Sequence, residues 1–241
     1  MSEAVDSRRL VHAVQVAGVH DRAEAEAVIA AGADFIGLPL RLRDGREDLS
    51  EAAARDLFRD LRGRVQRVLI TYLEDAPALL RFAEEIGCDW VQLHAAASAD
   101  LARTLRTERP GLGLIQALVV GADDVERAVD DCTPWVDAFI TDTFDPVRGR
   151  RGATGLRHDW GVSRRIVERS ERPVILAGGL GPDDVGKAIE ATGAVAVDAH
   201  TRLEGPDGQK DPALVARFVD EARRAFRGAA RRRAESEQER S

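Results

Sequence analysis

The stretch Pro173-Val-Ile-Leu-Ala-Gly-Gly-Leu180 decides the fold. It joins an apolar, β-branched run to two adjacent glycines, and a helical pattern over residues 182–191 follows at once. This order is typical of a buried strand that turns sharply into a helix, because glycine adopts the backbone conformations of tight turns. The next apolar run, residues 194–199, starts soon after the helix, so the segment reads as strand, helix and strand.

The same alternation continues through most of the chain. Strands are predicted at eight apolar runs, namely residues 12–17, 35–40, 65–72, 90–94, 112–119, 136–141, 173–177 and 194–199. Helices are predicted at residues 21–31, 50–61, 75–86, 98–107, 122–131, 159–169, 182–191 and 212–226. Strands that are apolar throughout and separated by helices are typical of a closed parallel sheet. The sequence therefore predicts one α/β domain over residues 1–227, a single (β/α)8 TIM barrel.

An open, doubly wound sheet is the rival fold. It favours a glycine-rich dinucleotide loop after the first strand, and Ala17-Gly18-Val19-His20 is not such a loop. Residues 228–241 change to an arginine-rich and then Ser/Glu/Gln-rich composition, which predicts a disordered, charged C-terminal tail. A basic contact site in this tail is the less favoured alternative.

Composition narrows the possible partners. The 241 residues carry a net charge of −7, so no overall positive field attracts nucleic acid or an anionic membrane. There is no apolar run near the roughly 18 residues that a membrane span needs. Two cysteines, Cys88 and Cys132, are too few for a disulfide framework and lack the spacing of a zinc site, which indicates a reducing, cytoplasmic location. No metal or cofactor is expected.

Lysine is rare, since only Lys187 and Lys210 occur among 35 basic residues. A Schiff base needs a neutral lysine amine, and arginine cannot supply one. Neither lysine is expected to reach the open end of the barrel, so lysine-based covalent catalysis is nearly excluded.

Residues that follow the strands of such a barrel line the end where ligands bind. Gly178 and Gly179 follow the seventh run. Two adjacent glycines let the backbone approach a ligand closely, and their amides can form a concave anion site. A phosphate-binding turn is the favoured interpretation, and a plain tight turn is the alternative.

The segment after the eighth run is rich in ionisable groups. Asp198 can orient a ligand hydroxyl, and His200 can exchange protons near neutral pH. Next to Thr201, Arg202 can bind an anion, and a surface ion pair with Glu204 is an equally favoured alternative.

Other strand ends also carry polar side chains. Asp142 follows the sixth run, where partial burial raises the pKa of a carboxyl toward that of a general acid. Arg46 lies in an arginine-rich segment that suits an anion, although such segments are more often solvated. Gln92 and His94 share one face of the fourth run and are expected at the open end, unless His94 is a core residue. Residues 148–155 suit either a loop that closes over an anion or a plain solvated loop.

Several segments recur together in one family. They are Ala30-Ala-Gly-Ala-Asp-Phe-Ile-Gly37, Val91-Gln-Leu-His94, Gly152-Ala-Thr-Gly155 with Asp159-Trp160, Pro173-Val-Ile-Leu-Ala-Gly-Gly-Leu180, and Val197-Asp198. In order and spacing they resemble phosphoribosylanthranilate isomerase, a barrel enzyme that performs an Amadori rearrangement in tryptophan biosynthesis. The resemblance spans residues 12–226.

The resemblance implies roles for individual residues. Asp142 matches the family's general acid, and Arg46 is similar in position to the arginine that holds the anthranilate carboxylate. The family's glycines after the seventh strand and its aspartate in the eighth match Gly178, Gly179 and Asp198. The resemblance adds Gly155 to the substrate-binding residues, which also include Gln92, His94, Thr201 and Arg202.

The chain also departs from the family pattern. The family's first strand has a Lys-Ile-Cys-Gly-like sequence whose cysteine is the general base, and here the stretch is Gln15-Val-Ala-Gly18, with Ala17 at the cysteine position. Alanine cannot accept a proton, so His200 is the expected replacement base. The small Ser-Ser-Gly run after the eighth strand is replaced by His200-Thr201-Arg202, which changes the phosphate pocket.

Three functions stay open. The first is an isomerase of phosphorylated sugars or amino-sugars with an altered substrate or mechanism. The second is a different reaction, such as an epimerase, lyase or rearrangement in a specialised pathway, and the third is a non-catalytic ligand-binding barrel. Each has a small phosphorylated molecule as partner, and the chain is expected to be a monomer or a homodimer.

Overall fold

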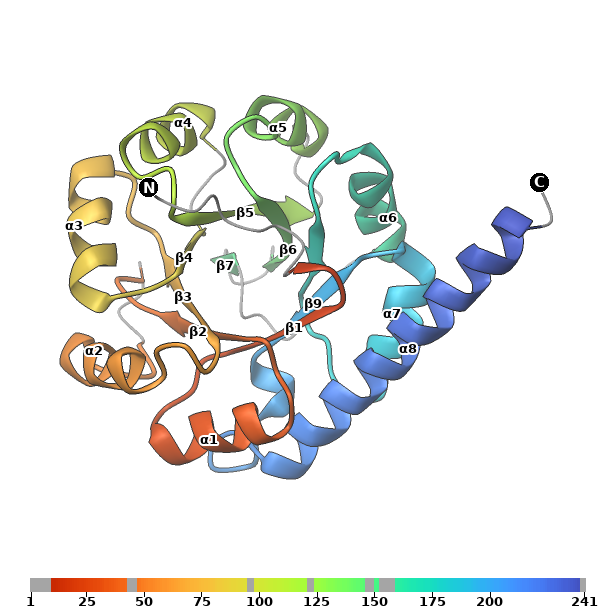
Figure 1. Cartoon of the computed structure of the whole chain (residues 1–241), viewed down its shortest axis with the longest axis horizontal. Coiled ribbons are helices and arrows are strands. Elements are labelled where there is room, and N and C mark those ends of the chain that lie inside the picture. The colour runs from red at the N-terminus through yellow and green to blue at the C-terminus, as the bar shows by residue number, and fades with distance from the viewer. Residues whose placement is uncertain are drawn as a thin grey trace.

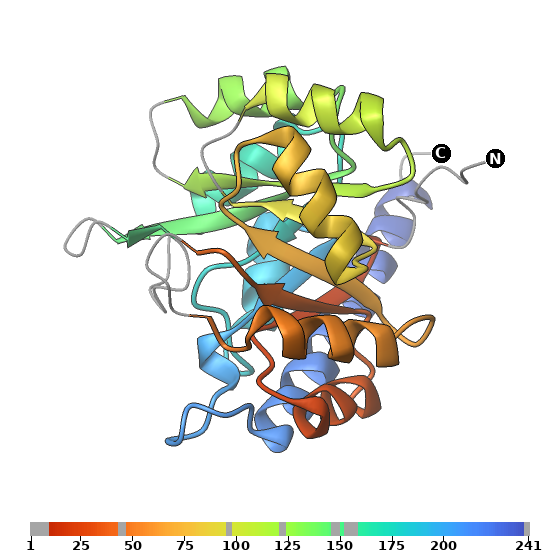
Figure 2. The same ribbon diagram turned by 90° about the vertical axis from the view of Figure 1, so that its left-hand side faces the viewer.

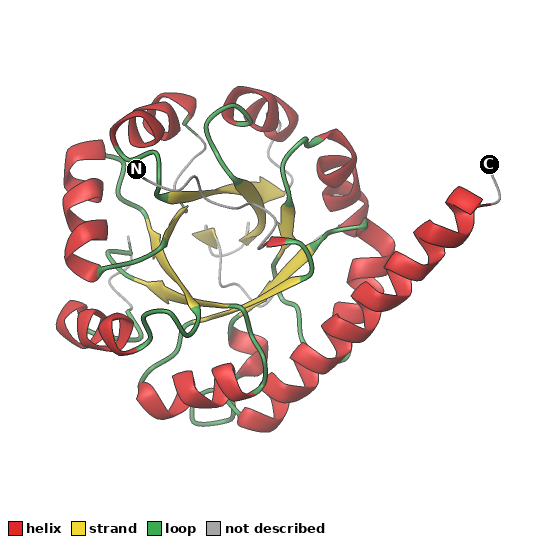
Figure 3. Cartoon of the chain, viewed as in Figure 1, coloured by secondary structure: helices red, strands yellow, loops and turns green. Residues whose placement is uncertain are grey.

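A computed structural model describes residues 10–42, 47–94, 98–120, 124–145, 150–151 and 159–238. At its centre is a closed ring of parallel strands surrounded by helices (Figures 1 and 3). The order around the ring is β1, β2, β3, β4, β5, β6, β8 and β9, and β9 pairs back with β1. The (β/α)8 barrel predicted from the sequence is confirmed.

The bounds of the elements follow the predicted runs closely. The ring consists of β1 (Ala13–Ala17), β2 (Phe35–Pro39), β3 (Gln66–Thr71), β4 (Trp90–Leu93), β5 (Gly113–Val120), β6 (Ala138–Asp145), β8 (Val174–Leu176) and β9 (Ala196–Ala199). The helices are α1 (Arg22–Ala30), α2 (Glu51–Asp60), α3 (Ala76–Ile86), α4 (Ala99–Glu108), α5 (Val125–Cys132), α6 (Trp160–Arg169), α7 (Val185–Thr192) and α8 (Pro212–Gln238). A short 3-10 helix, η2 (Thr201–Leu203), follows β9.

Side-chain caps fix where several helices begin. The caps of α1, α2, α3 and α4 accept a hydrogen bond from a first-turn amide, and they are Asp21, Ser50, Asp75 and Ser98. Such a cap pairs one of the amides that the first turn leaves without an intrahelical partner. Glycine ends α3 and α7, at Gly87 and Gly193, in the left-handed conformation that favours glycine.

The strands bury side chains on both faces. One apolar cluster contains strand residues but no α-helical residue, and it fills the inside of the ring. A second cluster joins the other strand faces to the helices. In β1, Ala13 and Ala17 belong to the inner cluster, whereas Val14 and Val16 belong to the outer one, as the two-residue period of a strand requires. Position 17 therefore faces the inside of the ring.

Two segments differ from the sequence prediction. β6 continues beyond the ring, where Phe144 and Asp145 pair antiparallel with β7 (Arg150–Arg151). Where the sequence predicts a disordered tail, α8 continues to Gln238 and projects past the barrel (Figure 1). Alanine and arginine in this segment favour helix, and Arg232 pairs with Glu190 of α7 at 3.1 Å. Within the described part of the chain, no helix has the length and apolar character needed to cross a membrane.

The parallel strands give the barrel one open end for ligands. All ring strands point toward the left-hand side of Figure 2, and the β6–β7 hairpin extends outward there. The predicted site residues follow these strand ends, so the fold gathers residues that are far apart in the sequence.

Candidate functional site

The structure brings most of the predicted site residues to the same end of the barrel. Gln92 lies in β4, Asp142 in β6 and Asp198 in β9, while Gly178 and Gly179 come directly after β8. His94 follows β4, and His200, Thr201 and Arg202 follow β9. Arg46 and Gly155 lie outside the residues that the structure describes.

A polar layer lies inside the ring below this end. The amide nitrogen of Gln15 in β1 donates to Oε1 of Gln92 across 3.1 Å, and both side chains are buried. Nε2 of Gln92 lies 3.2 Å from Nδ1 of His94, so these two side chains share one face, as predicted. The ring of His94 also packs edge-on against Tyr72, with centroids 5.1 Å apart. His94 is partly exposed and forms the rim of the layer rather than part of the apolar core.

Thr141 joins the strand end that carries Asp142 to the double glycine. Its buried hydroxyl accepts a hydrogen bond from the amide of Ala177 at 2.9 Å and donates to the carbonyl of the same residue at 3.2 Å. Asp142 is the next residue along β6, and Gly178 is the residue after Ala177. One hydroxyl thus fixes the relative position of two predicted site segments. Sequence reasoning missed Thr141, because a threonine in an apolar run reads as an ordinary strand residue.

The double glycine forms a sharp turn. Gly178 and Gly179 have φ values of +97° and +65°, a region that residues with a side chain rarely adopt. The turn is closed by the buried carboxylate of Asp184, which accepts a hydrogen bond from the amide of Gly181 at 2.8 Å. These two glycines are therefore required by the backbone of the turn itself.

Arg202 lies against this turn. Its guanidinium is 3.7 Å from Oδ2 of Asp184, and its side chain packs beside Gly181. The alternative of a surface pair between Arg202 and Glu204 is wrong, because Glu204 pairs with Lys210 instead, at 2.8 Å.

Lys210 corrects another expectation, since it was expected to stay away from the open end. Its side chain is 1% exposed, and Nζ donates to the carbonyl of His200 at 3.2 Å as well as to Glu204. The loop after η2 folds back, and a short bridge between Glu204 and Lys210 places the ammonium beneath His200. The sequence gives no signal for this, because a lysine in a polar loop usually stays in solvent.

His200 fills the space beside the end of β1. Gly18 has φ +70°, and a Cβ atom there would overlap the imidazole of His200. Burial lowers the pKa of His200 to about 3, with Lys210, His20 and His94 lowering it further. The imidazole is therefore neutral at neutral pH, with one of its two ring nitrogens unprotonated.

Comparison with known proteins identifies the family. Residues 14–221 match N-(5'phosphoribosyl)anthranilate (PRA) isomerase. The N-(5'-phosphoribosyl)anthranilate isomerase 2 of Methanosarcina mazei is 36% identical over 214 residues, which cover 88% of this chain and 95% of that protein. The chain belongs to the PRA isomerase family.

Two further members of the PRA isomerase family are similar. The enzyme of that name from Haloferax volcanii is 38% identical over 220 residues, covering 90% of this chain and 95% of its own. A crystal structure of a PRA isomerase in complex with reduced 1-(o-carboxyphenylamino)-1-deoxyribulose 5-phosphate superposes with a TM-score of 0.72. It is 25% identical and covers 87% of this chain and 97% of that one.

Ala17 sets the chain apart from the PRA isomerase pattern described above. Its side chain is 3% exposed in the inner cluster, and it offers no group that can accept a proton. The two cysteines cannot replace the family's thiol. Cys88 precedes β4 and Cys132 ends α5, and burial raises the pKa of these thiols to about 12 and about 11.

Proposed function

We propose that the protein catalyses an Amadori-type aldose–ketose isomerisation of a phosphorylated amino-sugar of the phosphoribosylanthranilate type, using a base other than cysteine. The observation that carries the proposal is the family match over residues 14–221 on a barrel that keeps Asp142 in β6 and Gly178–Gly179 after β8. Relatives from Methanosarcina mazei and Haloferax volcanii carry the name of this isomerase. A related structure holds a reduced deoxyribulose 5-phosphate compound, which supports a phosphorylated ligand.

The proposed reaction needs one acid and one base. Asp142 donates a proton to the ring oxygen of the aldose, and the sugar opens to an iminium. His200 then accepts the proton from C2, and the C2–H electron pair forms a C1=C2 double bond while the iminium π pair returns to nitrogen. The resulting enol becomes the ketose when C1 gains the proton from His200 and the C2 hydroxyl returns a proton to Asp142, so both groups regain their starting protonation. Only protons and electron pairs move, so the chemistry needs no cofactor.

The remaining predicted residues bind the substrate in this proposal. The backbone at Gly178 and Gly179, with Thr201 and Arg202, holds the phosphate, since amides and a guanidinium both suit an anion. Arg46 pairs with the carboxylate of the aromatic amine. Gln92, His94, Asp198 and Gly155 contact the sugar.

Steady-state turnover of phosphoribosylanthranilate by the purified protein tests this proposal. Replacing Asp142 by Asn removes the acid, and kcat should fall by about 10²–10⁴, the usual contribution of a positioned acid. His200→Ala should lower kcat in the same way. Asp130→Asn is the matched control, because Asp130 pairs with Arg169 on the outer surface. If the Asp142 variant turns over as fast as this control, the acid role is wrong.

The position of Arg202 favours a second candidate, in which the barrel performs a different reaction on another sugar phosphate. Its guanidinium lies against the turn that follows β8, beside Gly181, where the family pattern has small residues. A thermal shift with phosphoribosylanthranilate separates the two candidates, since a ligand at about 100 times its Kd adds roughly 2.7 kcal/mol of stability. A shift with another sugar phosphate but none with phosphoribosylanthranilate would favour the second candidate. No shift with any sugar phosphate would count against both.

A further inference from the structure

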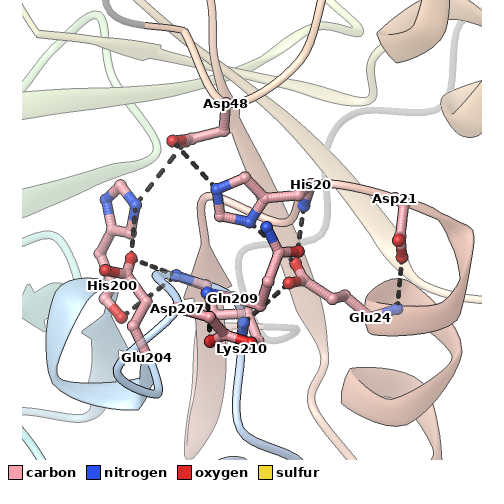
Figure 4. A network of polar contacts seen from close by, with 9 residues as sticks. All are labelled: His20, Asp21, Glu24, Asp48, His200, Glu204, Asp207, Gln209 and Lys210. Atoms are coloured by element: carbon pink, nitrogen blue, oxygen red, sulfur yellow. Dashed lines mark hydrogen bonds and ion pairs between the residues drawn. The ribbon is translucent and has the colours of Figure 1, made fainter.

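A dense group of ionisable side chains lies beside the end of β1, and most of it has no role in the reaction described above (Figure 4). This loop cluster consists of His20, Glu24, Asp48, His200, Glu204 and Lys210. Its members come from the segments that follow β1, β2 and β9. Barrel closure therefore creates the cluster, in which the hydrogen bond from Lys210 to Glu24 joins residues 186 positions apart.

Asp48 lies between two imidazoles. Its Oδ2 is 3.6 Å from Nε2 of His200, and its Oδ1 is 3.6 Å from Nε2 of His20 (Figure 4). Oδ2 is buried and makes no hydrogen bond with any residue that the structure describes. These separations exceed a normal hydrogen bond, and such contacts at catalytic sites often tighten only when substrate is bound.

The other two carboxylates of the cluster, Glu24 and Glu204, have partners besides the histidines. Oε2 of Glu24 accepts a hydrogen bond from the backbone amide of His20 at 2.7 Å and lies 3.1 Å from Nδ1 of the same histidine. A second oxygen of Glu24 accepts the amide of Lys210 at 2.7 Å. The ammonium of Lys210 balances the charge of Glu204, which lies 3.3 Å from Nε2 of His200. Asp48 is therefore the carboxylate of the cluster that lies near both histidines.

The protonation of the cluster follows from these contacts. Nε2 of His200 faces two carboxylates, so the neutral ring carries its proton there and keeps the lone pair on Nδ1. Nδ1 lies on the side of the ring away from Asp48, as Figure 4 shows. Burial raises the pKa of Asp48, while His20 and Lys210 act in the opposite direction. A carboxylate with a raised pKa is a better partner for a proton that moves toward it.

We propose that Asp48 is the positioning residue that holds the proton of His200 on Nε2, so that Nδ1 accepts the C2 proton of the substrate in place of the family's cysteine. This inference rests on the proposed function. As Nδ1 takes the proton, the ring becomes an imidazolium, and the negative charge of Asp48 stabilises it. The proton leaves the ring when C1 of the enol is protonated, so the net reaction neither gains nor loses a proton. A carboxylate that orients a catalytic imidazole acts in the same way in hydrolases.

Asp48→Asn tests the inference, because asparagine keeps the shape of the side chain and removes its charge. With phosphoribosylanthranilate as substrate, kcat should fall by at least about 100-fold while KM changes little, since loss of an orienting carboxylate can cost up to about 10⁴ in rate. Asp130→Asn again serves as the control and should keep the full rate. The same samples give the nitrogen-15 NMR signals of the histidine rings at pH 7. They should show His200 protonated at Nε2 in the unmodified protein and a mixture of tautomers in Asp48→Asn.

Each readout can overturn the inference by itself. A kcat of Asp48→Asn equal to that of the control, or a fall that comes only from KM, contradicts it. So does a His200 ring protonated at Nδ1. If the unmodified protein does not turn over phosphoribosylanthranilate, the proposed function fails, and the NMR measurement still decides whether Asp48 orients His200.

Discussion

Replacing Gly18 by alanine tests whether the His200 imidazole occupies the place that the structure gives it. The residue follows β1 directly, at φ +70°, and a Cβ atom there would overlap the ring of His200. The change therefore has two effects, a strained backbone and a displaced imidazole. Both destabilise the folded state, and only the second depends on His200.

The two effects can be separated by measuring the free energy of unfolding with and without the His200 ring. A non-glycine residue in the left-handed region costs about 1–2 kcal/mol. Forcing extra atoms into a packed site costs about another 1–3 kcal/mol. Gly18→Ala should therefore lower the free energy of unfolding by about 2–5 kcal/mol. In a His200→Ala background the ring is absent, so the same change should cost only the backbone part, about 1–2 kcal/mol.

Urea denaturation of the four proteins in this cycle measures the coupling between the two positions. Gly63→Ala is the matched control, because Gly63 has φ +76° and no atom lies within 4 Å of the added Cβ. It should cost about 1–2 kcal/mol in both backgrounds. If Gly18→Ala costs the same with and without the His200 ring, the imidazole does not occupy this place.

Further predictions concern the groups around this position. Thr141→Val leaves the amide and carbonyl of Ala177 without the hydroxyl that pairs them, so the free energy of unfolding should fall by about 1–3 kcal/mol. Thr141→Ser should keep most of that stability, and equal urea midpoints for both variants would contradict the role of the hydroxyl. The lowered pKa of His200 means that the folded state binds fewer protons than the unfolded chain between pH 6.5 and about 3. The contribution of the neutral His200 ring to the free energy of unfolding should be complete above pH 6.5 and fall by about 1.4 kcal/mol per pH unit across that window. In His200→Asn this pH dependence should be absent. A profile that is the same in both proteins would show that the ring titrates normally. Lys210→Met leaves Glu204 without its buried partner and should cost about 3 kcal/mol, whereas Lys187→Met should be close to neutral.

The fold was predictable because burial shapes the sequence of every ring strand. The apolar run at 90–94 predicted β4 (Trp90–Leu93), and the run at 35–40 predicted β2 (Phe35–Pro39). β6 was underestimated, because its polar continuation pairs with β7 outside the core. The helical continuation of α8 was missed because its composition resembles that of a solvated tail.

The site was predictable only in part. Barrel topology and the family resemblance together placed Asp142 and the double glycine at strand ends, and the structure puts both there. The surroundings of His200 were not predictable, because Asp48 and Lys210 lie in polar loops whose sequence resembles solvent-exposed surface. Their contacts depend on closure of the ring, which brings β9 beside β1. No short stretch of the sequence indicates such contacts.

Isomerisation in D2O, followed by NMR with the purified protein and phosphoribosylanthranilate, tests the central claim most directly. In the NMR spectra the signals of the aldose should be replaced by those of the ketose. The rate should fall at least about 100-fold in Asp142→Asn. Persistence of the aldose in the presence of the unmodified protein, or equal rates in the two proteins, would contradict the account.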